Sequence, residues 1–190
     1  MQKLVVASGN LGKIKEIAEI LKGKYEVVSM KDAGFDGDVE EDGETFFENA
    51  LKKAKTVSSA LNCSALADDS GLTVDALGGA PGVYSARYGG KHGDDLKNRK
   101  KLLKNLKGET DRKAQFKTCV VLYNPNGEYI TGYGETTGVI GEEEVGENGF
   151  GYDSVFISDD LGKTFAEATD EEKNSVSHRF RALSDLIKKL

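Results

Sequence analysis

Residues 3–29 are KLVVASGNLGKIKEIAEILKGKYEVVS, and this stretch decides the fold class. Its apolar beginning, Lys3–Ala7, predicts a buried strand. Apolar residues at helical spacing over Leu11–Lys22 predict a helix, and Tyr25–Ser29 predicts a second short strand. A strand, a helix and a strand in this order form a β-α-β unit, which indicates an α/β protein.

Further elements extend this beginning into a mixed sheet. Thr45-Phe46-Phe47-Glu48 matches a capping box and predicts a helix that runs to about Leu61. The turn signal Asn124-Pro125-Asn126-Gly127 separates two strand-like segments, which predicts an antiparallel hairpin. The other predicted elements are strands Ala65–Asp68, Ala114–Tyr123, Glu128–Thr137 and Ser154–Ile157, and helices Asp94–Lys107 and Ser177–Leu190. We therefore expect a single α/β domain over residues 1–190, with a mixed β-sheet and flanking helices.

Composition excludes several classes of function. The 26 Lys+Arg and 32 Asp+Glu of the 190 residues give a net charge of −6, which argues against a general binder of nucleic acid or anionic membranes. No apolar run approaches the roughly 18 residues of a membrane-spanning helix. Cys63 and Cys119 lie far apart in the sequence, which favours buried reduced thiols and a cytoplasmic protein.

The first chemical motif follows the first strand. Ser8-Gly9-Asn10-Leu11-Gly12-Lys13 joins that strand to the first helix. Glycines allow close approach of the backbone to a phosphate, and a helix N-terminus presents amide donors, so this turn is a candidate phosphate site. It is not a Walker A loop, because that motif needs a longer Gly-to-Lys spacing and a Ser or Thr after the Lys. A plain strand-to-helix turn with a surface lysine is the alternative.

The second motif is Ala67-Asp68-Asp69-Ser70-Gly71-Leu72. Two adjacent carboxylates at the end of an apolar strand repel each other unless a metal ion or another cation neutralises them. Such oxygen ligands suit Mg²⁺, which binds through one or two carboxylates together with substrate phosphates. The acidic loop 36–42 could supply a further ligand. An ordinary acidic turn is the alternative.

Two further groups of residues complete the candidate site. Asn49 and Lys53 lie one turn apart on the helix that begins after Thr45, although each position taken singly also fits a solvent-facing helix side. Aromatic residues beside glycines in the loop 149–153 suit stacking on a nucleotide base. Lys173 and Arg179 suit contacts with carbonyl or phosphate oxygens. The basic run 97–101 is interpreted as a solvated helix face.

Several motifs occur here in the order seen in the inosine triphosphate pyrophosphatase family, which the chain resembles from Ser8 to Leu183. They are SGNxxK at 8–13, TFxENAxxKA at 45–54, ADDSGL at 67–72, GAPGVYSARY at 79–88, GFGYD at 149–153 and EKNxxSHR at 172–179. Any one of them is weakly specific, but their common order makes a chance match improbable. The resemblance implies a mixed α/β fold with two lobes around a central cleft, a homodimer, and Mg²⁺-dependent hydrolysis of ITP, dITP and XTP to the monophosphate and pyrophosphate.

The resemblance also assigns roles to residues. It makes Asp69 the proton acceptor and a metal ligand, and Glu40 the second metal ligand. Lys53 together with Lys13 would neutralise the triphosphate. The remaining positions are Ser8, Gly9, Asn10, Leu11, Gly12 and Lys13 for the triphosphate, Ser70 as a substrate contact, and Phe150, Gly151, Tyr152, Asp153, Lys173, His178 and Arg179 for the base and sugar.

Two departures from the family pattern bear on these assignments. The acidic loop offers Glu40 and Glu41 as neighbouring candidates, so the choice of Glu40 depends on its distance from the other motifs. Ser154 stands where the family often has proline, which we expect to loosen the preceding loop. The competing hypotheses are a pyrophosphatase for dUTP, dTTP or a modified pyrimidine nucleotide, and a nucleotide-binding module without catalysis.

Overall fold

A computed structural model describes residues 2–190, and its strands form one six-stranded sheet in the order β2-β1-β3-β4-β5-β6. β1 pairs in parallel with β2 and with β3, whereas β5 pairs antiparallel with β6, so the predicted mixed α/β sheet is confirmed. The strands are β1 Gln2–Val6, β2 Tyr25–Ser29, β3 Ala65–Val74, β4 Lys113–Tyr123, β5 Tyr129–Ile140 and β6 Phe156–Ser158.

The helices begin and end close to their predicted limits, with one exception. They are α1 Leu11–Ile20, α2 Phe46–Leu61, α3 Asp95–Asn105, α4 Asp170–Val176 and α5 His178–Ile187, with short 3₁₀ helices η1 Asp75–Leu77 and η2 Gly82–Arg87. The capping box of α2 is confirmed, since Thr45 accepts from the Glu48 amide and Glu48 caps in return. The sequence prediction missed α4, which a second capping box of Thr169 and Glu172 begins.

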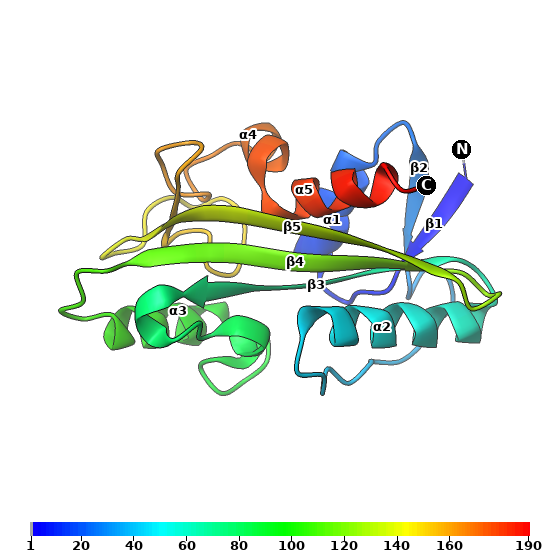
Figure 1. The fold of residues 1–190 in the computed structure, drawn as a ribbon, viewed down its shortest axis with the longest axis horizontal. Coiled ribbons are helices and arrows are strands. Elements are labelled where there is room, and N and C mark those ends of the chain that lie inside the picture. The colour runs from blue at the N-terminus through cyan, green and yellow to red at the C-terminus, as the bar shows by residue number, and fades with distance from the viewer. Residues whose placement is uncertain (1) are drawn as a thin grey trace. The chain divides into compact units, whose positions relative to one another are not determined.

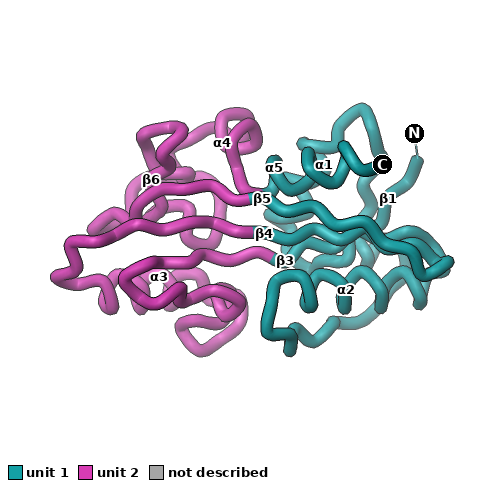
Figure 2. Tube along the Cα trace, in the orientation of Figure 1, with its two compact units in different colours: residues 1–69, 118–134, 179–190 teal, residues 70–117, 135–178 magenta. Residues whose placement is uncertain are grey.

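The chain forms two compact units, which Figure 2 distinguishes by colour. Unit 1 contains the described residues up to Asp69 together with Thr118–Gly134 and Arg179–Leu190, and unit 2 contains Ser70–Lys117 and Glu135–His178. Strands β3, β4 and β5 each contribute residues to both units, so neither unit is contiguous in the sequence. The single domain over residues 1–190 therefore remains a proposal, and the central cleft stays a prediction.

Unit 1 has helices on both faces of its strands (Figure 1). One apolar cluster joins α1 and α5 to one face through Leu4, Val6, Ile17, Leu21, Leu66, Val120, Leu122, Ala182, Leu183 and Leu186. A second cluster joins α2 to the other face through Val5, Ala7, Ala50, Ala54, Val57, Ala65, Ala67, Cys119 and Val121. Successive strand residues alternate between the two clusters because side chains of a strand point to opposite faces in turn.

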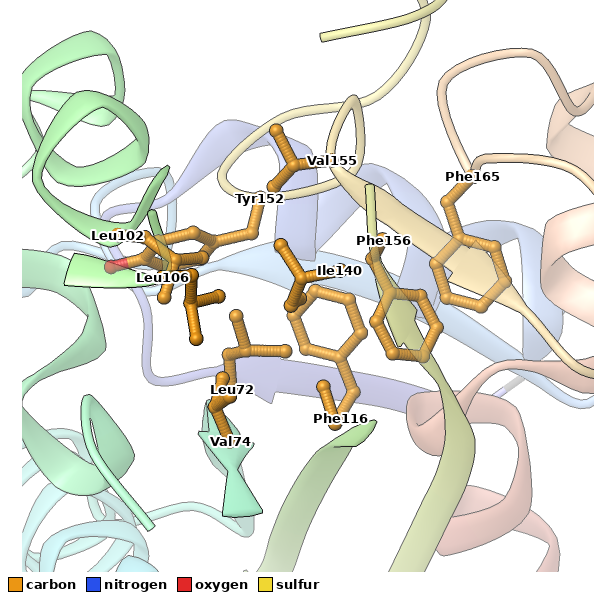
Figure 3. Close-up of a cluster of buried hydrophobic side chains, with 11 residues drawn as sticks. Leu72, Val74, Leu102, Leu106, Phe116, Ile140, Tyr152, Val155, Phe156 and Phe165 are labelled. Carbon is orange, nitrogen blue, oxygen red and sulfur yellow. The ribbon is translucent and has the colours of Figure 1, made fainter. Parts of the chain in front are cut away.

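Unit 2 has its own apolar core (Figure 3). Leu102 of α3 and Leu106, which directly follows this helix, pack there with Leu72, Val74, Phe116, Ile140, Tyr152, Val155, Phe156 and Phe165. The sequence predicted that the basic run in α3 faces solvent, but the structure differs from this prediction. Asn98 is buried and accepts a hydrogen bond from the Gly89 amide at 2.6 Å. Lys101 donates a hydrogen bond to the Tyr88 carbonyl at 2.8 Å. The chain folds back onto this helix, which a local charge pattern does not reveal.

Two remaining observations concern the membrane and the cysteines. Among residues 2–190, every helix is too short or too polar to cross a membrane. Cys63 and Cys119 are both free thiols, and burial raises the pKa of Cys119 to about 11. Cys119 is buried as expected, whereas Cys63 is only half-buried, and the reduced state of both thiols stays a prediction.

Candidate active site

The two adjacent carboxylates of β3 face opposite sides of the sheet in unit 1. Leu66 belongs to the cluster beneath α1 and α5, whereas Ala65 and Ala67 belong to the cluster beneath α2. The same alternation sends Asp68 toward α1 and α5, and Asp69 toward α2. The two acids therefore occupy separate environments, although they are neighbours in the sequence.

Asp68 is completely buried and surrounded by cations. Its carboxylate lies 2.6 Å from Lys13 Nζ and 3.2 Å from Arg179 Nε, and Thr118 Oγ1 donates to it at 2.8 Å. Burial opposes ionisation, but Arg179 and Lys13 outweigh it and hold the pKa of Asp68 well below its usual value. Asp68 is thus ionised at neutral pH and contacts two cations, Lys13 and Arg179.

Two residues of this network were missed by the sequence analysis. Glu16 of α1 is buried and accepts a hydrogen bond from Arg179 Nη1, so Arg179 lies between two carboxylates. Thr118 Oγ1 lies 2.8 Å from the Asp68 carboxylate and 2.9 Å from the Asp69 backbone carbonyl, and so contacts both acidic residues. Glu16 follows Lys13 by one helical turn, which is the one signal in the sequence that could have indicated it.

Asp69 contacts the α2 residues that the sequence places one turn apart. Asn49 Nδ2 donates to its carboxylate at 3.1 Å, and Lys53 Nζ lies 3.5 Å away. Asn49 and Lys53 are both buried, so these positions do not face solvent. Burial is the largest effect on Asp69 and raises its pKa, although Lys53 and Lys13 act in the opposite direction.

Lys53 joins Asp69 to the acidic loop. Its ammonium contacts Glu41 and donates to the Asp68 carbonyl at 2.8 Å. Burial would lower the pKa of Lys53, but Asp69 and Glu41 outweigh it and raise the pKa, so Lys53 stays charged. Lys53 thus contacts two carboxylates, and the nearby charge of Glu41 adds to the effect of burial in raising the pKa of Asp69.

The acidic loop is also fixed by α2. Asn49 Oδ1 accepts from the Gly43 amide at 2.8 Å while its Nδ2 holds Asp69, so one side chain aligns the loop with the carboxylate. Within this loop Glu41 is half-buried beside Lys53, whereas Glu40 is exposed. The structure therefore places Glu41 against the lysine that also contacts Asp69, whereas the choice of Glu40 as a metal ligand stays a prediction.

The turn 8–13 follows β1 at the edge where β3 carries Asp68. Val6, the last residue of β1, pairs in parallel with Leu66, so the turn begins beside the part of β3 that carries Asp68 two residues further on. Asn10 caps α1 by accepting from the Lys13 amide at 3.1 Å, and the Asn10 amide donates to Ser8 Oγ at 3.1 Å. Leu11, the first residue of the helix, has 80% of its surface exposed, so the turn is accessible to solvent at this residue.

Most residues predicted to hold the base and sugar lie in unit 2. Lys173 is buried, lies 2.6 Å from Asp153 and sits 4.8 Å above the Phe150 ring. Tyr152 is buried in the unit 2 core, where its hydroxyl donates to the Ser85 carbonyl at 2.7 Å (Figure 3). Its ring is therefore held in the core of unit 2, and its contact with the base or sugar stays a prediction.

The last two predicted residues have different surroundings. The buried His178 ring in unit 2 stacks on Phe116, with centroids 4.8 Å apart. Arg179 is buried in unit 1 against Asp68 and Glu16. These contacts show Arg179 as part of the Asp68 network, while its contact with the base or sugar stays a prediction. Ser70 is half-buried on β3 directly after Asp69.

Fold and site together indicate an α/β protein that binds phosphates, with two buried acids in the middle of β3 and ammonium groups from α1 and α2 beside them. The chain belongs to the Ham1 family, whose profile matches residues 4–189. It is 52% identical over 194 residues to a protein named dITP/XTP pyrophosphatase from Haemophilus influenzae, covering 100% of this chain and 99% of that one. A Bacillus subtilis protein of the same name is 48% identical over 193 residues, covering 100% and 98%.

A solved structure gives the same result for the fold. The Ham1 protein from Coxiella burnetii superposes with a TM-score of 0.88 at 39% identity, covering 100% of this chain and 98% of the other. The family resemblance and the fold class inferred from the sequence are therefore confirmed.

Proposed function

We propose that this chain hydrolyses ITP, dITP and XTP to the nucleoside monophosphate and pyrophosphate, and so removes aberrant purine nucleotides. The observation that carries the proposal is the Asp69 cluster of unit 1, in which a carboxylate with a raised pKa lies beside the charged Lys53 and the half-buried Glu41. The names of the relatives from Haemophilus influenzae and Bacillus subtilis support the substrate class.

The triphosphate is bound by the turn after β1 and by two lysines. A triphosphate carries about four negative charges, so an acidic protein must neutralise them locally. Lys13 is 15% exposed beside Asp68, at the N-terminus of α1 with its amide donors, and Lys53 lies beside Asp69. Asp69 accepts a proton of the attacking water, whose oxygen bonds to the α-phosphorus while the bond from that phosphorus to the bridging oxygen breaks, so that the monophosphate forms and pyrophosphate leaves.

Mg²⁺ fits the two carboxylates of this cluster. The negative charge of Glu41 disfavours ionisation of Asp69, and a Mg²⁺ ion held by these two carboxylates would relieve this effect; carboxylates together with substrate phosphates are ligands that Mg²⁺ prefers. Within residues 2–190 no group of three or more His, Cys, Asp or Glu side chains is arranged around a metal site, which agrees with a metal that relies on the nucleotide for further ligands. Such an ion supplies charge neutralisation at the phosphates and an activated water.

We assign the second metal ligand to Glu41 instead of Glu40, and a matched pair of variants tests this. Glu41→Gln is expected to raise the Mg²⁺ concentration required for half-maximal activity by about tenfold or more, because a carboxylate ligand is lost. Glu40→Gln, which changes an exposed neighbour, is expected to leave it unchanged. A Mg²⁺ titration of initial rates measures both, and the reverse ranking of the two variants would return the assignment to Glu40.

Base selection follows from the polarity of the groups in unit 2. Hypoxanthine and xanthine present a carbonyl at C6, which suits a donor such as Lys173 or His178, whereas adenine presents an amino group there. A mismatch of this kind leaves buried donors unpaired and is worth roughly 10⁴-fold in kcat/KM. Guanine also has the C6 carbonyl, so its rejection must come from the C2 side.

The substrate class is tested by comparing kcat/KM for ITP, dITP, XTP, GTP, ATP, dUTP and dTTP, with pyrophosphate as the detected product. We expect ITP, dITP and XTP to be the best substrates, and ATP to be poorer than ITP by roughly 10⁴-fold. A preference for ATP or for a pyrimidine nucleotide would contradict the proposal.

Two further properties are proposed with the activity. The substrates belong to the cytoplasmic nucleotide pool, so we place the protein in the cytoplasm. The homodimer implied by the resemblance stays a prediction.

A further inference from the structure

One turn of α3 holds the loop 149–153 through both backbone groups of a single glycine. Asp95 Oδ2 accepts a hydrogen bond from the Gly151 amide at 2.9 Å, and Arg99 Nη1 donates one to the Gly151 carbonyl at 2.8 Å. Asp95 and Arg99 lie one helical turn apart, so they project from the same face of α3. Both bonds involve a charged side chain, which makes them stronger than bonds between neutral groups.

Arg99 also connects the loop to Glu144, which precedes it, and through Glu144 to Ser154, which follows it. Its Nε contacts the Glu144 carboxylate, and Ser154 Oγ donates to that carboxylate at 3.2 Å. Ser154 is the residue expected to loosen the loop, because the family often has proline there. In this chain the hydroxyl is instead tied, through Glu144, to the same arginine that holds Gly151.

The loop requires such support because its own backbone does not define its shape. Gly149 and Gly151 adopt φ values of +73° and +62°. Glycine reaches these values without strain, but it populates negative φ values about as readily, so its own backbone preference does not select this conformation. A Cβ at Gly149 would collide with the Asp153 carboxylate, so glycine is required there. The contacts from α3 fix the conformation that these glycines only permit.

Because Gly151 is bonded to Phe150, the position of Gly151 restricts the position of the Phe150 backbone and ring. The Phe150 amide donates to Asp153 Oδ2 at 3.0 Å, the same atom that Lys173 Nζ contacts at 2.6 Å, and Lys173 lies over the Phe150 ring. On one side the loop is thus fixed by Asp153 and Lys173, and on the other by α3. Phe150 is half-buried, so part of its surface is accessible to a ligand.

We infer that Asp95 and Arg99 are positioning residues for base binding, which act by holding Gly151 and thereby aligning Phe150 and Lys173 with the base. The inference depends on the proposed function, because that function makes the loop 149–153 a base-binding element. Neither residue contacts the nucleotide. Their loss is expected to weaken recognition of the base and sugar and to leave recognition of the phosphate tail unchanged, because the tail is bound by residues of unit 1.

The test measures binding by calorimetry, without turnover, using IMP as a probe for the base and sugar and inorganic tripolyphosphate as a probe for the tail. Arg99→Met and Asp95→Ala are each expected to weaken IMP binding by about tenfold, because each removes one charged hydrogen bond to the loop. Asp95→Asn keeps an acceptor oxygen and is expected to restore most of the affinity. Lys100→Met removes a cation from the next, exposed position of α3 and serves as the matched control.

Tripolyphosphate binding is expected to be the same in all of these variants, a result that a general loss of structure would not give. Unchanged IMP affinity in Arg99→Met and Asp95→Ala would overturn the inference, as would equal weakening of both probes or an absence of IMP binding by the wild-type protein. Wild-type protein that binds IMP but releases no pyrophosphate from ITP would contradict the proposed function alone, and the positioning role would still be decided by the two probes.

Discussion

Replacing Asp69 by asparagine is expected to lower kcat for ITP by about 10²-fold or more, because the amide cannot accept the proton of the attacking water. The folded state should be no less stable than that of the wild type. Burial raises the pKa of Asp69, which means that the native environment disfavours its charge relative to the unfolded chain. A neutral residue of the same shape removes that disfavoured charge and can still contact Asn49.

Steady-state kinetics and thermal unfolding of the Asp69→Asn protein measure the two effects separately. Wild-type turnover in this variant would remove Asp69 from the mechanism. A large loss of stability would show instead that Asp69 is a structural carboxylate.

Unlike the Asp69 variant, a variant with asparagine in place of the neighbouring Asp68 is expected to be less stable than the wild type, with a loss of about 3 kcal/mol in the free energy of unfolding at pH 7. Asp68 is completely buried beside Lys13 and Arg179, and its removal leaves the buried Arg179 with Glu16 as its remaining named carboxylate partner. A domain is stable by only ~5–15 kcal/mol, so urea denaturation should detect the change readily.

The effect of Asp68 on stability should also depend on pH. The pKa of Asp68 is lowered in the folded protein, so its contribution is complete above the unfolded-state value near 3.8 and is lost as the pH falls through the lower folded value. The difference between wild type and Asp68→Asn should therefore narrow in that acidic range. Asp38→Ala, at an exposed acid of the loop 36–42, is the control and should not change stability. Equal stability of the Asp68→Asn protein at pH 7 would contradict the role given to this network.

Features determined by nearby residues were predictable from the sequence. The β-α-β beginning and the capping box of α2 depend on apolar spacing and on bonds within one turn, and both are confirmed. β3 was predicted to end at Asp68 but extends to Val74, since pairing within the sheet outweighs the weak strand preference of Asp69, Ser70 and Gly71. Within α3, Leu96 is exposed whereas Leu102 lies in the core, so the apolar character of a residue does not by itself identify the buried face of this helix.

The site was predictable in its residue types but not in its connections. The alternation along β3 already implies that Asp68 and Asp69 face opposite sides, yet it does not say which helix each one meets. Arg179 reaches Asp68 across 111 residues of sequence, and Arg99 reaches Gly151 across 52, so both contacts depend on the tertiary fold. The Glu41 assignment likewise required the position of Lys53.

The central claim is that the Asp69 cluster catalyses cleavage between the α- and β-phosphates of an aberrant purine nucleotide. The most direct measurement is chromatographic identification of the products formed from ITP by the wild-type and Asp69→Asn proteins, with and without Mg²⁺. The account predicts IMP and pyrophosphate from the wild-type protein with Mg²⁺, and almost no product in the other three reactions. Release of IDP and phosphate, or equal product without the metal or without the Asp69 carboxylate, would contradict it.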